Sequence, residues 1–359
     1  MTAGLHLVTD RDRRGAQVHA SDLCEGLREV GATADLVALA PGTHGDLLEI
    51  DALGAGRRSR TTFAGLRRRA QDYDVVVAHG SATLLACAVG LAGTGIPFVY
   101  RQISDPLFWA STPWRRLRVA AMIRRAARVV ALSDGVGDTF AGHYRLDRGR
   151  VVTIPNAVPG RHWAPASRDE RPERRAELGL PEDGVAIVHV GALVPEKGVP
   201  SVVRLASVIE GVYVVIVGDG PDRDELEALA TRTAPARVIF TGSLDEPRRA
   251  FAATDVLVLA SRGGDSMPAV LIEAGLCGLP AVSTPVGAIP DVVEDGVTGR
   301  IVPIGDEEGL VGAVRALVDD RTRREAMGAA ARARCLERFT IEAVAPRWQR
   351  LLDEVAAAG

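Results

Sequence analysis

The chain has 359 residues, of which 47% are hydrophobic and 25% charged, and its formal net charge is −3. This balance is typical of a soluble globular protein and excludes a disordered chain, a collagen and a coiled-coil rod. No apolar run reaches the roughly 18 residues of a membrane span, and we expect no secretory signal. The four scattered cysteines form no C-x-x-C pair, so they predict neither a zinc site nor a disulfide framework and indicate a reducing, cytoplasmic location.

The weak negative charge gives no reason to expect a nucleic-acid partner, but charge and lysine usage are both uneven. Residues 1–160 carry 20 Arg against 15 Asp and Glu, whereas residues 161–359 carry 23 Lys and Arg against 31 Asp and Glu. Lys197 is the only lysine among 43 basic residues. Either chance kept one lysine in an arginine-rich chain, or its ammonium group has a chemical role.

Short β-branched runs recur along the chain, and a stretch of helical periodicity follows each of them. The predicted strands are 5–9, 35–40, 75–78, 97–101, 129–132, 151–154, 185–190, 213–217, 238–241, 256–259, 281–284 and 300–302. Several are continuously apolar, which indicates parallel sheets covered by helices on both faces. The most regular helices are expected at 82–93, 306–319, 321–338 and 341–356.

So many strands exceed one sheet of ordinary size, which predicts an α/β fold with two domains. Five prolines lie among charged residues between positions 155 and 181, a composition typical of a linker. We therefore expect two Rossmann-like, doubly wound parallel-sheet domains facing a central cleft, with residues 1–160 in the first and 161–340 in the second. Ligands of such sheets bind beyond the carboxyl ends of the strands, so the loops that follow the strands are the candidate sites.

The loop after the first strand reads Asp10-Arg-Asp-Arg-Arg-Gly-Ala-Gln17 and leads into an amphipathic helix. Gly15 stands at the start of that helix, where a residue without a side chain lets a ligand approach free backbone N–H groups. The loop is not G-x-G-x-x-G, so it carries no dinucleotide fingerprint. A simple helix-starting glycine is the alternative interpretation.

The second domain repeats this arrangement. Its first strand ends in Gly191-Ala-Leu-Val-Pro-Glu-Lys-Gly198, which places the only lysine before a helix. An ammonium group beside helix N-terminal amides suits a phosphate, although a solvated loop lysine is the alternative. The next strand ends in Gly218-Asp-Gly-Pro221, another tight turn into a helix with proline at its start.

The most informative segment follows strand 256–259 and reads SRGGDSMPAVLIEAG from Ser261 to Gly275. Asp265 lies in its loop, and Pro268 fits the first turn of the next helix, so the neighbouring amides point at a ligand. Glu273 lies about one and a half turns into that helix. An acid among apolar neighbours needs a polar partner, and the two hydroxyls of a ribose can supply it. An exposed helix residue is the alternative for Glu273.

These elements together resemble the retaining GT-B glycosyltransferases of family 4, also called glycosyl transferases group 1. The pair Asp265 and Glu273 resembles the family's E-x7-E element, and residues 190–198 resemble its V-G-x-L-x-x-x-K-G element. Further matches, in the family's order, are Ile154-Pro-Asn-Ala-Val158, Gly218-Asp-Gly-Pro221, Phe240-Thr-Gly242 and the segment 287–299. The resemblance covers nearly the whole chain.

The resemblance implies transfer of a sugar from a nucleoside-diphosphate sugar to an acceptor hydroxyl, with retention at the anomeric carbon and with no metal and no other cofactor. The acceptor would be a small natural product, a lipid or a glycan. The implied catalytic residues are Asp265, Lys197, which would hold the diphosphate, and Glu273, which would hold the ribose. The implied donor-binding residues are Gly15, Ala16, Lys197, Gly218, Arg262, Ser266, Met267, Pro268, Ala269 and Glu273. The first domain would hold the acceptor, and the C-terminal helix, 341–359, would cross back to it.

Three features differ from the family pattern. Asp265 stands where the first acid is usually Glu, and Ala192 stands where an Arg usually precedes the lysine, which makes Arg262 the candidate replacement. A family histidine is missing after strand 97–101, which ends in Arg101, while His79 resembles another recurrent position. His79 and Arg101 are therefore the acceptor-side candidates, and an ordinary strand-end residue is the alternative for His79.

Two other functions remain as alternatives. A metal-dependent GT-A transferase needs a D-x-D pair, and the formal matches 10–12 and 222–224 both stand at helix starts, where acids are common as caps. A non-catalytic, two-lobed sugar- or nucleotide-binding protein would need no acidic pair beside a phosphate-binding lysine. Only a transferase, or a slow donor hydrolase, would release the nucleotide.

Aromatic and basic residues gather between positions 109 and 128. They are Trp109, Trp114, Arg115, Arg116, Arg118, Arg124, Arg125 and Arg128. Such a cluster suits peripheral contact with an anionic membrane or with a phosphorylated acceptor, and a solvated helix face is the alternative. The motifs define neither the acceptor nor the oligomeric state.

Overall fold

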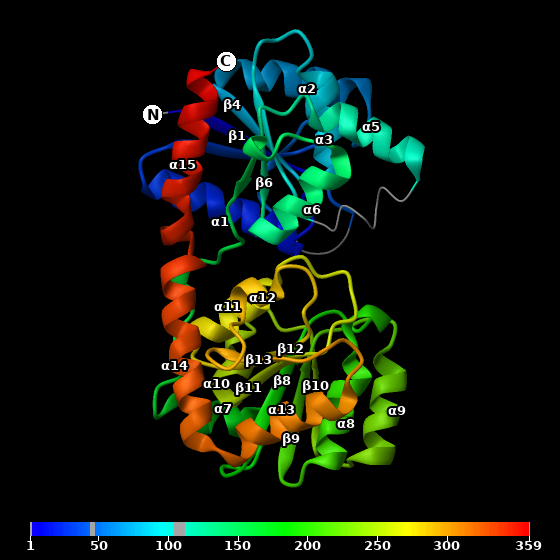
Figure 1. Ribbon diagram of the computed structural model, residues 1–359, viewed down its shortest axis with the longest axis vertical. Coiled ribbons are helices and arrows are strands. Elements are labelled where there is room, and N and C mark those ends of the chain that lie inside the picture. The colour runs from blue at the N-terminus through cyan, green and yellow to red at the C-terminus, as the bar shows by residue number, and fades with distance from the viewer. Residues whose placement is uncertain (1, 44–46, 104–111, 359) are drawn as a thin grey trace. The chain divides into compact units, whose positions relative to one another are not determined.

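The computed structural model describes residues 2–43, 47–103 and 112–358 (Figure 1). The chain forms two compact units. Unit 1 comprises Met1–Pro159 together with Arg338–Gly359, and unit 2 comprises Gly160–Glu337. The last helix of the chain therefore belongs to the same unit as the first strand.

Unit 1 is built on a parallel seven-stranded sheet in the order β3-β2-β1-β4-β5-β6-β7. Its strands are β1 (Ala3–Val8), β2 (Thr33–Ala38), β3 (Asp51–Ala52), β4 (Val75–His79), β5 (Phe98–Arg101), β6 (Arg128–Ala131) and β7 (Val151–Thr153). In β1, Leu5 and Leu7 face one apolar layer while Val8 faces the other, as the two-residue period of a strand requires. The sheet is thus buried on both faces, which explains its continuously apolar strands.

Helices cover both faces of this sheet. They are α1 (Gly15–Glu29), α2 (Arg60–Arg69), α3 (Ser81–Gly90), α5 (Pro113–Ile123), α6 (Asp134–Tyr144) and α15 (Ile341–Ala357). Helices α2, α3, α5 and α6 contribute to one apolar layer, and α1 and α15 contribute to the other. Several begin at a hydroxyl cap: Ser59, Ser133 and Thr340 each accept a backbone N–H of the first turn.

Unit 2 is built on a parallel six-stranded sheet in the order β10-β9-β8-β11-β12-β13. Its strands are β8 (Val185–Val190), β9 (Val212–Val217), β10 (Val238–Gly242), β11 (Val256–Leu259), β12 (Ala281–Ser283) and β13 (Gly299–Ile301). Its helices are α7 (Glu170–Glu177), α8 (Val199–Val208), α9 (Arg223–Thr233), α10 (Arg248–Ala253), α11 (Ala269–Leu276), α12 (Ile289–Val292), α13 (Glu307–Asp319) and α14 (Arg321–Arg338), the last residue of which belongs to unit 1. Helices α8, α9 and α13 pack on one face of the sheet, and α10 and α11 contact strands from the other.

Helix α15 packs against α1, and its Trp348 is fully buried in the apolar layer between them and the sheet. The segment before α15 is attached by a parallel bridge between Val158 and Thr340, in which Val158 N donates to Phe339 O at 3.1 Å and Ile341 N donates to Val158 O at 2.9 Å. These contacts explain why the C-terminal residues form part of unit 1.

The α/β class with two doubly wound parallel sheets is confirmed, and the predicted strands lie within two residues of the observed ones at each end. The short edge strand β3 was missed, because two residues, Asp51 and Ala52, carry no apolar pattern. In the part of the chain that the structure describes, no helix is long and apolar enough to cross a membrane.

Candidate functional site

Lys197 and Asp265, two of the predicted catalytic residues, meet in unit 2. Lys197 ends a short 3₁₀ turn, η4 (Pro195–Lys197), that follows β8, and its Nζ forms an ion pair with Oδ1 of Asp265. The other carboxylate oxygen, Oδ2, accepts a hydrogen bond from Ser261 Oγ at 2.6 Å. The Lys197 side chain is 23% exposed and the Asp265 side chain 9%, so the ammonium group is the more accessible partner.

Glycines let the loops around this pair approach one another closely. A Cβ on Gly198 would lie 2.1 Å from the carbonyl oxygen of Ala260, and a Cβ on Gly287 would lie 2.4 Å from the carbonyl oxygen of Asp265. Both glycines have a positive φ, +63° and +58°, which other residues rarely adopt. The loops after β8, β11 and β12 are therefore packed backbone against backbone at the carboxyl edge of the sheet.

The turn after β9 joins the same group of loops. Gly218 has φ +136°, and a Cβ there would lie 1.9 Å from the carbonyl oxygen of Gly191. Leu193 N donates to Asp219 O at 2.9 Å, and Asp222 N donates to Leu193 O at 3.1 Å. Gly218, a predicted donor-binding residue, is thus placed beside the loop that carries Lys197.

The predicted donor-binding residues 266–269 lead directly into α11. Pro268 is the N-cap of this helix, which has no side-chain cap and no acid in its first turn, so its first N–H groups retain their capacity to bind an anion. Ser266 O accepts a hydrogen bond from Ala288 N at 2.5 Å, and Met267 is 3% exposed. Glu273 lies in the second turn of α11 and is partly buried, in agreement with its predicted depth.

Arg262 is an exposed residue of the same loop. Its backbone N donates to Glu196 O at 2.7 Å, which ties the loop to the turn before Lys197. It lines a small hollow together with Ser201, Asp306 and Glu307. The prediction that Arg262 replaces the arginine missing at Ala192 therefore remains a prediction, while the ionic partner of Lys197 is Asp265.

Two residues near the pair were not singled out from the sequence. Ser261 is fully buried and binds Asp265, as described above. His189, in β8, is also fully buried and its Nδ1 lies 3.1 Å from Val258 O. Burial, with a smaller contribution from the charge of Lys197, lowers the pKa of His189 to about 4, so this imidazole is neutral at pH 7. Ser261 begins the segment that carries Asp265, so its position directly after a buried strand was the available signal.

In unit 1, Gly15 and Ala16 form the start of α1, as predicted. Gly15 is exposed, and a Cβ built on it would meet no atom within 4 Å. Asp10 at the end of β1 accepts hydrogen bonds from the side chains of Arg14, Gln17 and Arg57. Burial opposes ionisation of Asp10, but the hydrogen bonds of Arg14 and Gln17 outweigh it and lower the pKa of this carboxyl.

The acceptor-side candidates His79 and Arg101 lie together, but inside unit 1. His79 is 2% and Arg101 is 1% exposed, and Arg101 NH1 lies 3.3 Å from His79 Nδ1. His79 Nε2 in turn lies 3.0 Å from Nδ1 of His6, and Arg101 NH2 donates to Asn156 Oδ1. Burial lowers the pKa of Arg101 to about 9 and that of His6 to about 3. The network links three strands to the segment after β7, and the acceptor role of these residues remains a prediction.

The two D-x-D segments differ in their surroundings. The Asp10 carboxylate is bound by two arginines, whereas Asp222 stands at the N-cap of α9, as expected, without a side-chain cap bond. Within residues 2–43, 47–103 and 112–358, no group of three His, Cys, Asp or Glu side chains is arranged to hold a metal ion.

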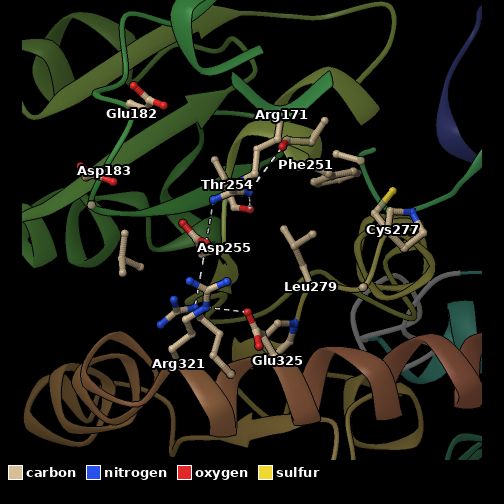
Figure 2. Close-up of a pocket in the computed structure, with 18 residues that line it drawn as sticks. Arg171, Glu182, Asp183, Phe251, Thr254, Asp255, Cys277, Leu279, Arg321 and Glu325 are labelled. Atoms are coloured by element: carbon tan, nitrogen blue, oxygen red, sulfur yellow. Dashed lines mark hydrogen bonds and ion pairs between the residues drawn. The ribbon is translucent and has the colours of Figure 1, made fainter. Parts of the chain in front are cut away.

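A cavity of about 470 Å³ lies at the opposite, amino-terminal edge of the unit 2 sheet (Figure 2). Figure 2 shows Asp255 at its centre, where Oδ1 accepts a hydrogen bond from Arg171 at 2.8 Å and Oδ2 accepts one from Ala186 N at 2.9 Å. Arg321 and Glu325 of α14 pair at 2.7 Å on its wall. Asp255 thus joins Arg171 of α7 to the start of β8, and these contacts hold α7 on the sheet.

Comparison with known proteins finds a family model that matches each of the two units. A family model described as Glycosyltransferase Family 4 matches residues 13–159, and a model described as Glycosyl transferases group 1 matches residues 170–334. The lipopolysaccharide core biosynthesis glycosyltransferase LpsE of Rhizobium meliloti (strain 1021) is 32% identical over 179 residues, which are 50% of this chain and 52% of LpsE. That match spans about half of the relative's length. The alpha-maltose-1-phosphate synthase of Mycolicibacterium smegmatis is 28% identical over 377 residues, 96% of each protein.

Among solved structures, HepE of Anabaena in complex with UDP-glucose has a TM-score of 0.85 and 22% identity, over 99% of this chain and 100% of that chain. This likeness defines the fold class, which is GT-B with two Rossmann-like units. With both family models matched in order, the chain belongs to glycosyltransferase family 4, of the glycosyl transferases group 1 type. The resemblance stated from the motifs is confirmed, and the GT-A alternative is wrong for this fold.

Proposed function

We propose that the protein is a retaining glycosyltransferase that moves a sugar from a nucleoside-diphosphate sugar to an acceptor hydroxyl. The observation that carries the proposal is the convergence of Lys197, Asp265, Gly218 and the start of α11 at the carboxyl edge of the unit 2 sheet. Open α/β sheets bind their ligands at this edge. Relatives named glycosyltransferases and a structural neighbour that binds UDP-glucose support the same donor class.

The chemistry assigns a task to each of these groups. When the bond between the anomeric carbon and the β-phosphate breaks, negative charge concentrates on the departing diphosphate. The Lys197 ammonium group can stabilise this negative charge as a cation. The uncapped N–H groups at the start of α11 can donate hydrogen bonds to it, so no metal ion is needed. Glu273, one turn deeper in α11, would accept the ribose hydroxyls. Asp265 would hold the ammonium group in place through its ion pair.

Release of the nucleotide tests the class of the protein. The full chain is incubated with UDP-, GDP- and dTDP-sugars, and the free nucleoside diphosphate is measured over time. We expect slow release with one donor, faster release once an acceptor is found, and loss of nucleotide affinity in Glu273→Ala by calorimetry. Tight nucleotide binding without release from any donor would favour the non-catalytic binding protein.

Retention needs a separate measurement. With an α-linked donor, the anomeric coupling constant of the product in ¹H NMR, read before any equilibration, should be that of an α-glycoside. A β-glycoside as the first product would show inversion and would leave the transferase assignment intact while overturning the retaining one.

We propose in addition that unit 1 rests on an anionic membrane surface through α5. Trp114 is 77% and Leu117 is 59% exposed on this helix, and the sequence from 112 to 128 has six arginines and no acid. Exposed aromatic and aliphatic side chains beside arginines favour the interface of anionic lipids. Of the predicted cluster, Trp109 lies outside the described residues.

Sedimentation with lipid vesicles tests this contact. We expect binding to vesicles that contain phosphatidylglycerol and little binding to pure phosphatidylcholine vesicles. Trp114→Ser with Leu117→Ser should weaken binding at least about tenfold, because burying each side chain is worth about 1.5–3 kcal/mol. Val89→Ser removes another exposed apolar side chain, 49% exposed and on α3, and should have no effect. Equal sedimentation of all variants would leave α5 as a solvated helix.

A further inference from the structure

Two arginines of unit 1 are held on one buried carboxylate. Arg14 NH2 donates to both oxygens of Asp10, at 2.7 and 2.6 Å, and Arg57 NH2 donates to Oδ2 at 2.5 Å. Gln17 Nε2 donates to Oδ1 at 2.8 Å. The Asp10 side chain is 2% exposed, whereas those of Arg14 and Arg57 are 57% and 50% exposed. The carboxylate is thus a buried anchor from which two guanidinium groups extend to the surface.

The second acid of this loop belongs to the same group. Arg14 NH2 also lies 3.7 Å from Oδ2 of Asp12, so two carboxylates and two guanidinium groups share this place. The NH2 atoms of both arginines contact Oδ2 of Asp10 and therefore lie within about 5 Å of each other. Each guanidinium has five N–H donors, and among the described residues most of those of Arg14 and Arg57 meet no protein acceptor. The arrangement keeps unused guanidinium donors at a fixed place.

That place is the carboxyl edge of the unit 1 sheet. Arg14 is the N-cap of α1 and ends the loop that follows β1, and Arg57 comes from the segment between β3 and α2. The space over Gly15, next to Arg14, is open. A ligand on this edge therefore meets both guanidinium groups and the first backbone N–H groups of α1.

We propose that Arg14 and Arg57 bind an anionic group, a phosphate or a carboxylate, carried by the acceptor. The proposal rests on the proposed function, which gives the donor to unit 2 and the acceptor to unit 1. Guanidinium groups present paired N–H donors that match two oxygens of a phosphate or carboxylate. Because Asp10 sets their positions in advance, little side-chain entropy is lost when the anion binds. The diphosphate of the donor is the other source of the same chemistry, and the test separates the two.

The test is calorimetric titration of inorganic phosphate into the full chain, with and without saturating UDP, or GDP or dTDP if the donor screen selects that base. We expect phosphate to bind in both cases, because UDP occupies the unit 2 site. Arg57→Gln should weaken phosphate binding at least about tenfold, the loss of one charge-assisted hydrogen bond, and should leave UDP affinity within twofold. Arg58→Gln, an exposed neighbour with the same charge change, is the matched control and should leave phosphate affinity unchanged.

Three results would overturn the proposal. If UDP displaces phosphate, the two arginines serve the donor diphosphate. If Arg57→Gln and Arg58→Gln weaken phosphate binding equally, the effect is diffuse surface charge. If phosphate does not bind, the pair is structural. A thermal melt of each variant shows whether it is folded, and Arg14→Gln provides a second variant of the pair if Arg57→Gln does not fold. Failure of UDP, GDP and dTDP to bind would count against the proposed function instead, and the titration without nucleotide would still decide the role of the arginines.

Discussion

Lys197 and Asp265 pair with each other although 68 positions separate them in the sequence. The pair joins the loop after β8 to the loop after β11, and Ser261 binds the carboxylate oxygen that the ammonium group does not use. Both oxygens of Asp265 therefore have protein partners. This arrangement fixes the position of the Lys197 ammonium group, the only lysine ammonium group in the sequence.

Removing the ammonium group should impair the enzyme severely. A charge-assisted contact to the diphosphate is worth about 1.5–3 kcal/mol, so Lys197→Ala should lower kcat/KM by roughly 10–100-fold. Arg249→Ala, which removes a largely exposed cation of unit 2, is the control and should change kcat/KM less than twofold. Steady-state kinetics with the best donor measures both variants. Kinetics of Lys197→Ala close to those of wild type would exclude this residue from the site.

We expect kcat to depend more on the negative charge at position 265 than on the length of the side chain. Asp265→Asn keeps the shape but loses the ion pair, so we expect kcat to fall at least about 100-fold, near 2.7 kcal/mol. Asp265→Glu should keep part of the activity, and Ser261→Ala should cost less than Asp265→Asn because it removes a neutral hydrogen bond. If Asp265→Asn turns over as fast as wild type, Asp265 has only a local role in its loop.

The close approach of Gly287 to the Asp265 loop gives a test of loop position. In Gly287→Ala, the new Cβ would lie 2.4 Å from Asp265 O and 2.5 Å from Ser266 O, so the loop must move. Gly296→Ala shares the positive φ, +79° against +58°, but its Cβ would meet no atom within 4 Å. We expect both variants to lose about 1 kcal/mol of stability from backbone strain, and only Gly287→Ala to lose most of its kcat. Equal kcat values would mean that the Asp265 loop need not hold this position.

Turnover should not need a divalent cation. The proposed chemistry meets the leaving diphosphate with Lys197 and backbone N–H groups, which take the place of a metal ion. Excess EDTA, followed by desalting, should therefore leave kcat within about twofold on a scale where 1.36 kcal/mol is tenfold. The rate before and after addition of Mn²⁺ or Mg²⁺ provides the comparison. Abolition by EDTA with rescue by either cation would contradict the metal-free mechanism.

The buried histidines of unit 1 should make stability depend on pH. The pKa of His6 is lowered by burial, with a further contribution from Arg101, to about 3 from its usual 6.5. Below pH 6.5 His6 becomes protonated in the unfolded chain but stays neutral in the folded chain. The free energy of unfolding is therefore highest above this pH and falls as the pH drops toward 3. His6→Asn keeps a hydrogen-bonding group toward His79 but does not titrate.

Between pH 6 and 5, wild type should therefore lose about 1 kcal/mol more of its unfolding free energy than His6→Asn does. Urea denaturation at each pH gives the two values, and His162→Asn, at an exposed position, is the control. Parallel pH profiles of wild type and His6→Asn would show that His6 is already protonated in the folded chain.

The fold was predictable because its signals are local. Strands such as β9 are continuous β-branched runs, and the prolines and glycines that bound them stand in the sequence itself. The short strand β3 forms only because β2 offers it an edge, a tertiary cause that a two-residue segment cannot reveal. The motifs likewise gave the identity and order of Lys197, Asp265 and Glu273, because each follows a strand whose carboxyl end was recognisable.

Contacts between loops that are distant in the chain could not be predicted from the sequence. Such contacts depend on how loops meet after the sheet has formed. Examples are the Lys197 ion pair, the Ser261 hydrogen bond and the hydrogen bonds of Asp10 with Arg14 and Arg57. The burial of Arg101 was unexpected for the same reason. A strand-end arginine normally extends to solvent, but here α1 and α15 cover that face of the sheet and Asn156 takes up the guanidinium.

The solitary lysine has a practical consequence for the chain as a polymer. A protease that cleaves only after lysine can cut this sequence at one peptide bond, between Lys197 and Gly198, and would release fragments 1–197 and 198–359. That bond lies in a turn whose lysine is engaged by Asp265 and whose glycine is packed on Ala260, so it is cleaved only when the turn opens locally. The rate of this single cut therefore reports how often the turn opens, and each variant or ligand that steadies the Lys197 loop will be visible as a slower digest.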